Sequence, residues 1–150
     1  MTVKVDDIKK LREATGAGIA DCRRALEEAK GDFKKAEDLL RSWGIDKATQ
    51  KADRKTRAGI VDTYIHHNLT SGATVSLACE TDFVARTDEF KDLAHQIAMQ
   101  VAAVNPDSLK QLLDSYWIKD EKKTIDELIK EHIAKLGENI EVKEFKRFEI

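Results

Sequence analysis

The segment VDTYIHHNLTSGATVSLACE, residues 61–80, contains a change from helical spacing to the two-residue period of a strand. Two sets of residues alternate with their neighbours: Val61, Thr63 and Ile65, and then Val75, Leu77 and Cys79. The residues between the two sets, Asn68–Gly72, are typical of a turn and include a glycine. Two alternating runs joined by such a turn predict a β-hairpin.

The residues after the hairpin return to helical spacing. A long apolar stripe ends before Pro106, which stops a helix at that point. Its members are Phe90, Leu93, Ala94, Ile97, Val101 and Val104. Asp107 or Ser108 then begins a short helix that continues through Leu113, and a further amphipathic helix ends at Gly137.

The C-terminal residues, 140–150, predict a third strand. Four apolar residues share one phase: Ile140, Val142, Phe148 and Ile150. Phe145 is out of phase with them, which indicates a β-bulge near Glu144. The hairpin, the helices and this strand together predict an α+β core, in which a small antiparallel three-stranded sheet packs with helices.

The residues before the hairpin predict three short helices joined by short loops. Their expected limits follow from capping residues: Asp6 or Asp7 begins the first helix, Gly16–Gly18 ends it, Gly31 ends the second, and Asp32 and Gly44 bound the third. We therefore expect a three-helix N-terminal domain, residues 1–52, and a core domain, residues 53–150. Residues 45–58 form a basic connector, interpreted either as a solvated linker helix or as a phosphate-binding strip.

The composition is that of a folded globular chain. Of 150 residues, 41% are apolar and 36% are charged, with one proline and seven glycines, which excludes collagen-like and low-complexity classes. The net charge of −2 argues against bulk nucleic-acid binding. We find no apolar run long enough for a membrane span, no secretory signal in residues 1–10 and no disulfide framework in two cysteines, so we expect a cytoplasmic protein.

The chain contains no motif of a common catalytic or metal centre. It lacks the phosphate-binding loop of ATPases and GTPases and the glycine-rich dinucleotide fingerprint. His66 and His67 are adjacent on the expected strand, so their side chains should point to opposite faces and cannot share a metal ion. Cys22 and Cys79 lie on predicted core faces, where cysteine acts as a small apolar residue. The sequence therefore predicts a binding protein without catalytic residues, cofactor or metal.

One short segment, Glu80–Arg86, stands out at the junction between the second strand and the long helix. Phe83 follows three polar residues there, at the expected tip of a turn. In one interpretation Phe83 tucks beneath the turn, and Thr81 or Asp82 caps the helix. In the other, Phe83 is exposed beside the Asp82 carboxylate, an arrangement that suits an anchor for a partner protein.

Three longer motifs occur in order along the chain. They are Leu11–Gly18 (LREATGAG) with its continuation through Leu26, Cys79–Arg86 (CETDFVAR), and Ile133–Ile140 (IAKLGENI). With these motifs the sequence resembles the bacterial elongation factor Ts family, the nucleotide-exchange factors of the GTPase elongation factor Tu. The resemblance implies a role in translation elongation, an N-terminal domain of the ubiquitin-associated type, and a core that also serves in dimerisation.

The resemblance also implies two contact regions for elongation factor Tu. In the N-terminal domain they are Arg12, Ile19 and Ala20, and in the core they are Thr81, Asp82, Phe83 and Val84. Relatives often carry two methionines where this chain has Ile19 and Ala20, so bulk is missing at the second position. In the family, the Asp and the Phe intrude beside the nucleotide site of the GTPase and displace its Mg²⁺ ion. GDP then leaves, and the factor itself performs no catalytic chemistry.

The core is short for this family. Only residues 106–136 separate the long helix from the Gly-Glu-Asn motif, whereas many members have a core of two related halves. Short members pair so that two copies complete the core, which implies a homodimer and a complex of two factors with two GTPases. Two other functions fit parts of the sequence. One is an adaptor of the ubiquitin-associated type that binds through residues 1–52 without exchange activity. The other is a small metal-dependent enzyme using His66, Cys79 and nearby acidic residues.

Overall fold

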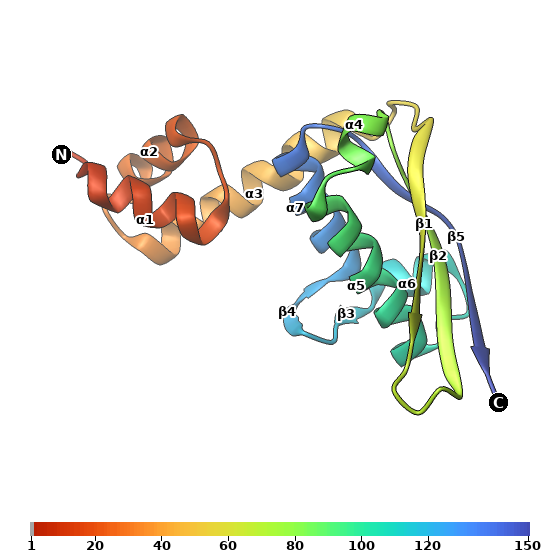
Figure 1. Cartoon of the computed structure of the whole chain (residues 1–150). Coiled ribbons are helices and arrows are strands. Elements are labelled where there is room, and N and C mark those ends of the chain that lie inside the picture. Colours follow the sequence, from red (N-terminus) through yellow and green to blue (C-terminus); the bar gives the residue numbers. More distant parts are fainter. Residues whose placement is uncertain (1) are drawn as a thin grey trace. The chain divides into compact units, whose positions relative to one another are not determined.

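The structure is a computed structural model that describes residues 2–150. These residues divide into two compact units, of which the first ends at Lys47 and the second comprises Ala48–Ile150. The first unit is helical, and the second combines a sheet with helices (Figure 1). None of the helices formed by residues 2–150 is long and apolar enough to cross a membrane.

Three helices make up the first unit. They are α1 (Val5–Thr15), α2 (Ile19–Glu28) and α3 (Phe33–Lys51), the last turn of which belongs to the second unit. Small and medium apolar side chains form their core: Leu11, Cys22, Ala25, Leu26, Ala29, Ala36 and Leu40. The predicted limits at Gly31 and Asp32 are confirmed, because the Gly31 amide donates to the Leu26 carbonyl and the Asp32 carboxylate accepts from the Lys35 amide.

The start of α1 differs from the prediction. Lys4 occupies the N-cap position, in extended conformation, and no side chain caps the helix there. Asp6 and Asp7 lie within the first turn instead. Their negative charges still favour the N-terminal end of the helix, through its dipole rather than through a capping hydrogen bond.

The third helix does not end at Gly44, as predicted, but continues through Lys51. A single glycine inside a helix costs only about 1 kcal/mol relative to alanine. Ala48, three residues before the end of this helix, is 2% exposed and belongs to the core of the second unit. Burial on both sides of Gly44 thus outweighs the glycine, and the first half of the basic connector 45–58 is helical.

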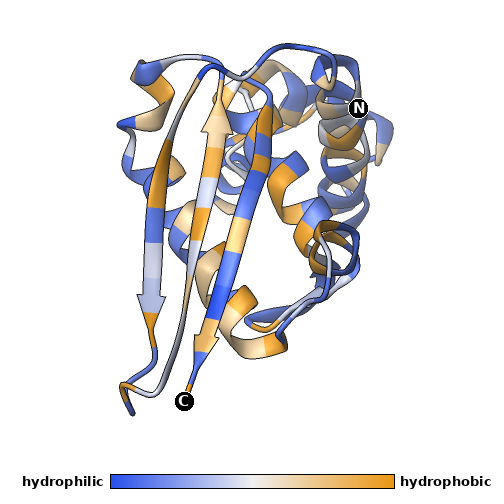
Figure 2. Ribbon diagram, turned by 90° about the vertical axis from the view of Figure 1, so that its right-hand side faces the viewer, coloured by the Kyte–Doolittle hydropathy of each residue, from blue (hydrophilic) through white to orange (hydrophobic). Residues whose placement is uncertain are grey.

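The second unit contains the predicted three-stranded antiparallel sheet. Its strands are β1 (Ala58–Ile65), β2 (Ser71–Cys79) and β5 (Ile140–Glu149), and β2 lies in the centre. The helices α5 (Asp88–Val104), α6 (Leu109–Asp114) and α7 (Ile125–Leu136) lie to one side of the sheet, and Figure 2 shows its other face towards the viewer. The prediction of an α+β core is therefore confirmed.

A β-bulge in β5 sets which of its side chains reach the core. Ser76 pairs with Glu144 and Leu77 with Val142, so Lys143 is the additional residue. The predicted bulge near Glu144 is confirmed. The bulge reverses the alternation, and Phe145 therefore packs against the core.

The outer face of the sheet carries exposed apolar side chains. In β1, residues alternate between half-buried and exposed, and Val61 and Ile65 are 72% and 56% exposed. Phe148 of β5 is 59% exposed because it follows the bulge. Gly72 lies between Ile65 and Phe148 in the register of the three strands, and a Cβ there would meet the Ile65 side chain at 2.8 Å.

A two-stranded hairpin, β3 (Tyr116–Trp117) and β4 (Asp120–Thr124), was not predicted. Its sequence is rich in charge and has no apolar alternation. A buried side chain of α5 holds it: the Gln100 amide donates to the Tyr116 carbonyl at 2.8 Å and accepts from the Ile118 amide at 3.0 Å. These bonds link residues 16 and 18 positions apart, which a local pattern does not reveal.

Candidate functional site

The junction between β2 and α5 is a single helical turn, α4 (Asp82–Ala85), with Thr81 as its N-cap. The Thr81 hydroxyl accepts a hydrogen bond from the Val84 amide at 3.4 Å, as capping requires. Val84 and Ala85 pack against the core, whereas Phe83 is 78% exposed. Thr81 therefore caps the turn as one interpretation predicted, but Phe83 projects from it as the other did.

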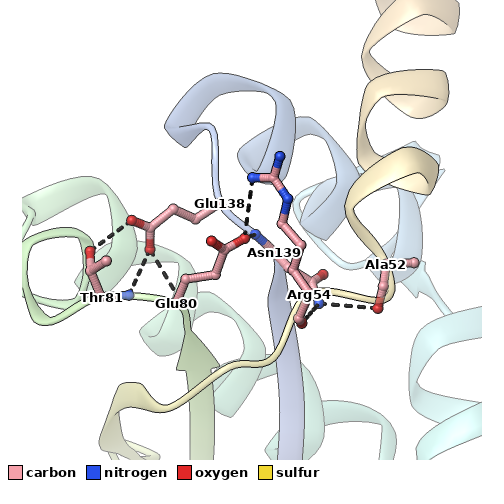
Figure 3. Close-up of polar contacts among 6 residues, drawn as sticks. All are labelled: Ala52, Arg54, Glu80, Thr81, Glu138 and Asn139. Carbon is pink, nitrogen blue, oxygen red and sulfur yellow. Dashed lines mark hydrogen bonds and ion pairs between the residues drawn. The ribbon is translucent and has the colours of Figure 1, made fainter.

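One carboxylate fixes the residues that lead into this turn (Figure 3). Glu138 Oε1 accepts hydrogen bonds from the amides of Glu80 and Thr81, at 3.1 and 2.9 Å. Glu138 Oε2 accepts a hydrogen bond from the Thr81 hydroxyl at 2.7 Å. The chain turns towards them at Gly137, which ends α7 with a φ of 77°, a conformation that favours glycine.

A second set of bonds runs in the opposite direction between the same two segments (Figure 3). Glu80 Oε1 accepts from the Asn139 amide at 2.8 Å and lies 3.6 Å from the Arg54 guanidinium. The Asn139 side chain donates to the carbonyls of Ala52 and Arg54, at 3.3 and 2.9 Å. Asn139 is only 3% exposed. The bonds thus satisfy a buried polar group and fasten the segment that follows α3.

The charges beside Phe83 lie at the surface. Asp82 Oδ2 is 3.4 Å from the Arg86 guanidinium, and both side chains are more than half exposed. An exposed pair of this kind contributes at most about 1 kcal/mol. A partner can therefore replace Arg86 beside the Asp82 carboxylate at little cost. The turn offers a projecting ring with an adjacent carboxylate.

The histidines do not form a centre with Cys79. Cys79 pairs with Ala58 at one end of the β1–β2 hairpin, whereas His66 follows Ile65 at the other end. A metal-dependent enzyme therefore cannot use both residues at one ion. The rings of His66 and His67 lie 4.1 Å apart, so the expectation of opposite faces is wrong, because β1 ends at Ile65 and its alternation ends with it. Throughout residues 2–150, no three His, Cys, Asp or Glu side chains are grouped as metal ligands.

The N-terminal residues expected to contact a partner lie in the first unit. Arg12 is on α1, Ile19 and Ala20 begin α2, and all three are exposed, Ile19 by 59%. The loop before Ile19 is fixed by Thr15, whose hydroxyl accepts from the Ala17 amide at 3.3 Å. The structure thus places Thr81–Val84 together in one turn, whereas Arg12 lies in the last turn of α1 and Ile19 and Ala20 lie in the first turn of α2.

Residues 80–150 match the family model described as "Elongation factor TS". Over its whole length, the chain is 39% identical to elongation factor Ts of Thermotoga neapolitana, of which it covers 98%. It is 40% identical to elongation factor Ts of Thermotoga maritima, of which it covers 97%. The chain belongs to the elongation factor Ts family. The resemblance inferred from its three motifs is thereby confirmed.

Elongation factor Ts proteins differ in length, and this chain has fewer residues than the relatives described here. Its alignment with the Thermotoga neapolitana relative extends over 193 positions, although the chain has 150 residues. That relative therefore carries residues that have no counterpart here. The chain is also 42% identical to elongation factor Ts of Aquifex aeolicus, but covers only 53% of it.

Glu138 and Asn139 are the site residues for which no role was predicted. They belong to the third family motif, but 57 positions separate Glu138 from Thr81. Nothing in the local spacing indicates that these segments meet. The signal available was chemical: a Glu-Asn pair directly after a helix-ending glycine has polar groups that must find partners when buried.

The thiol of Cys79 should be unreactive in the folded protein. Cys79 is fully buried and its Sγ donates to the Thr81 carbonyl at 3.1 Å. Burial raises the pKa of this thiol above its ordinary value, and the negative charge of Glu138 raises it further. Less thiolate is then present at neutral pH than in an exposed cysteine, and the thiolate is the reactive form. Mass spectrometry after iodoacetamide treatment should show modification only after unfolding in urea; rapid labelling of Cys79 in the folded protein would contradict this expectation.

Proposed function

We propose that this chain acts in translation elongation as the guanine-nucleotide exchange factor of elongation factor Tu. Membership of the family supports this function. The observation that carries it is the turn Thr81–Val84, which presents Phe83, 78% exposed, from a base held by hydrogen bonds. The factor binds elongation factor Tu with GDP, displaces the Mg²⁺ ion and promotes GDP release, so that GTP can bind. It acts by binding, without catalytic chemistry or a cofactor of its own.

The proposed mechanism uses the strict geometry of Mg²⁺. This ion requires near-ideal octahedral coordination and joins phosphate oxygens to protein oxygens. Phe83, inserted beside the nucleotide site, shifts the elements that support the ion. Asp82 contributes through its charge and its hydrogen bonds near the ion, not as a base. Without the ion the phosphates lose their counter-charge, and GDP leaves.

The energetics follow from the reciprocity of coupled binding. A factor that binds the empty GTPase tightly must weaken nucleotide binding by the same factor. A weakening of about 10⁴-fold requires about 5.5 kcal/mol of differential binding. One anchor residue contributes about 2–4 kcal/mol, so Phe83 supplies a large part of it. The exposed residues Arg12, Ile19 and Ala20 supply a second contact, on the nucleotide-binding domain of the GTPase.

Stopped-flow release of a fluorescent GDP analogue tests this function. Elongation factor Tu loaded with the analogue is mixed with excess unlabelled GDP, with and without this protein. We expect release to accelerate in proportion to the concentration of the factor. No acceleration by the folded protein, with a matched GTPase, would rule out the exchange function.

The alternative is an adaptor of the ubiquitin-associated type that lacks exchange activity. The separate helical unit, with its exposed Ile19, is the observation that favours it. An adaptor would bind its partner through residues 1–52 and would be indifferent to replacement of Phe83. The exchange assay on wild type and on the Phe83 variant described below therefore separates the two functions.

We further propose that two copies associate through the outer face of the sheet, as a homodimer that can bind two GTPases. Three apolar residues on this face are more than half exposed: Val61, Ile65 and Phe148. They lie on one side of an open sheet whose other side the helices cover (Figure 2). Exposed apolar residues gathered on one face are typical of an interface.

Sedimentation equilibrium tests the homodimer. We expect a mass near twice the 16.9 kDa of one chain at micromolar concentrations. Phe148→Lys places a charge in the proposed interface and should shift the mass to that of the monomer. The matched control is Tyr116→Lys, because Tyr116 is also exposed but lies on β3. A monomeric wild type, or a Phe148→Lys protein that remains dimeric, would refute the interface.

A further inference from the structure

The third family motif contacts Glu80 and Thr81, the residues that lead into the exposed turn (Figure 3). The contact residues proposed above, Thr81–Val84 in the core and Arg12, Ile19 and Ala20 in the first unit, do not include this motif. Glu138 and Asn139 nevertheless make six hydrogen bonds to the two segments that lead into the turn and out of α3. Their position calls for a role other than direct contact with a partner.

All polar atoms of Thr81 are occupied in this arrangement. Its amide donates to Glu138 Oε1, and its hydroxyl donates to Glu138 Oε2 while accepting from the Val84 amide. Its carbonyl accepts from the Ala85 amide at 3.2 Å and from the Cys79 thiol at 3.1 Å. Five bonds to one residue leave Thr81 a single conformation, the extended one from which α4 starts.

The bonds to Glu138 are strong and specific. The Glu138 carboxylate accepts three hydrogen bonds from two adjacent residues, and each of these bonds is charge-assisted because the acceptor is ionised. Glu138 is itself held in place, because the amide of the next residue, Asn139, donates a hydrogen bond to the Glu80 carboxylate. The two Glu-containing pairs therefore fix each other, and neither segment can turn without breaking bonds in the other.

We propose that Glu138 is a positioning residue for nucleotide exchange: its carboxylate holds Thr81 as the N-cap of α4, so that Asp82 and Phe83 project in a fixed direction. The proposal rests on the exchange function proposed above. A side chain can shift the elements that support the ion only if the turn that carries it stays rigid. A turn that is already ordered in the free protein also needs no binding energy to become ordered. Glu138 supplies this order without touching the GTPase.

Three variants of two glutamates test the proposal. Glu138→Ala removes all three bonds and should slow factor-stimulated GDP release by roughly 10- to 100-fold, as loss of a positioning group does elsewhere. Glu138→Gln keeps an oxygen that accepts from both backbone amides and should retain most of the activity. Glu121→Ala is the matched control, because Glu121 is an exposed residue of β4, and it should behave as wild type.

Amide hydrogen exchange provides a readout that does not depend on elongation factor Tu. The amides of Val84, Ala85 and Arg86 bond to Thr81 and Asp82, and none of them bonds to Glu138. In Glu138→Ala they should exchange faster, whereas the amides of β2 should keep their protection. If Glu138→Ala fails to fold, Glu138→Asp provides a second variant, because it keeps the charge but shortens the side chain by one methylene group. The same three amides should then exchange faster than in wild type.

The outcomes separate the two proposals. Loosened turn amides with slowed GDP release would support the positioning role. Unchanged turn amides, or loosened amides with normal GDP release, would overturn it. If wild type itself failed to stimulate GDP release, both the exchange function and the role of Glu138 in exchange would be refuted. Hydrogen exchange of the turn amides would still show whether Glu138 holds the turn.

Discussion

Replacement of Phe83 by alanine should slow factor-stimulated GDP release by roughly 30- to 900-fold, the equivalent of about 2–4 kcal/mol for an anchor residue. The physical reason is that the Phe83 ring is the group proposed to insert beside the nucleotide site. The ring contributes little to the stability of the fold, because it is 78% exposed. The free energy of unfolding should therefore remain within about 0.5 kcal/mol of wild type. Stopped-flow release of the fluorescent GDP analogue and urea denaturation measure the two quantities.

The control for this experiment is another exposed aromatic residue. Tyr116 lies on β3 and is 64% exposed, so Tyr116→Ala removes an aromatic ring from a different surface. It should leave GDP release unchanged. Normal release with Phe83→Ala would refute the wedge, and equal losses with both variants would indicate a general effect of lost surface area.

Replacement of Phe90 by alanine should have the opposite result. Phe90 lies seven residues after Phe83 but is fully buried beneath the sheet. Truncation of such a ring leaves a cavity and costs about 3–5 kcal/mol of stability. Because the chain has two units, the unfolding of the second must be followed by itself. Trp117 packs on its core and Trp43 on that of the first, so Trp117 fluorescence in a Trp43→Phe background reports it.

The two variants distinguish a residue that contacts the partner from a residue that stabilises the fold, within a single stretch of chain. Phe83→Ala should alter exchange alone, whereas Phe90→Ala should lower the urea midpoint of the second unit. At low urea, the Phe90 variant should still accelerate GDP release, because Phe83 and its supports remain. A change of less than about 1 kcal/mol with Phe90→Ala would mean that the core closes around the missing ring.

Those parts of the fold that depend on local periodicity could be predicted from the sequence. The stripe from Phe90 to Val104 predicts α5, and the phase change at Phe145 predicts the bulge. The features that were missed depend on distant residues. The continuation of α3 past Gly44 depends on burial of Ala48 in the second unit, and the β3–β4 hairpin depends on the buried Gln100.

The candidate site divides in the same way. The segment Thr81–Val84 is conspicuous in the sequence because Phe83 follows polar residues at a junction. Whether that ring is exposed could not be decided locally, since a capped turn is compatible with either position. The decision comes from the packing of Val84 and Ala85 on the core and from the bonds that Glu138 makes to Thr81, and both require the complete fold.

The order in which a ribosome makes the chain gives the Glu138 contact a further consequence. Phe83 is synthesised 55 residues before Glu138, and Asn139 and all of β5 follow Glu138. The early segments can form helices and a hairpin as they emerge, but the turn cannot acquire its support, nor β2 its second neighbour, until Glu138 and β5 have been made. A nascent or truncated chain that stops before Glu138 thus displays Phe83 on an unsupported turn, and on the proposal above it should stimulate exchange poorly.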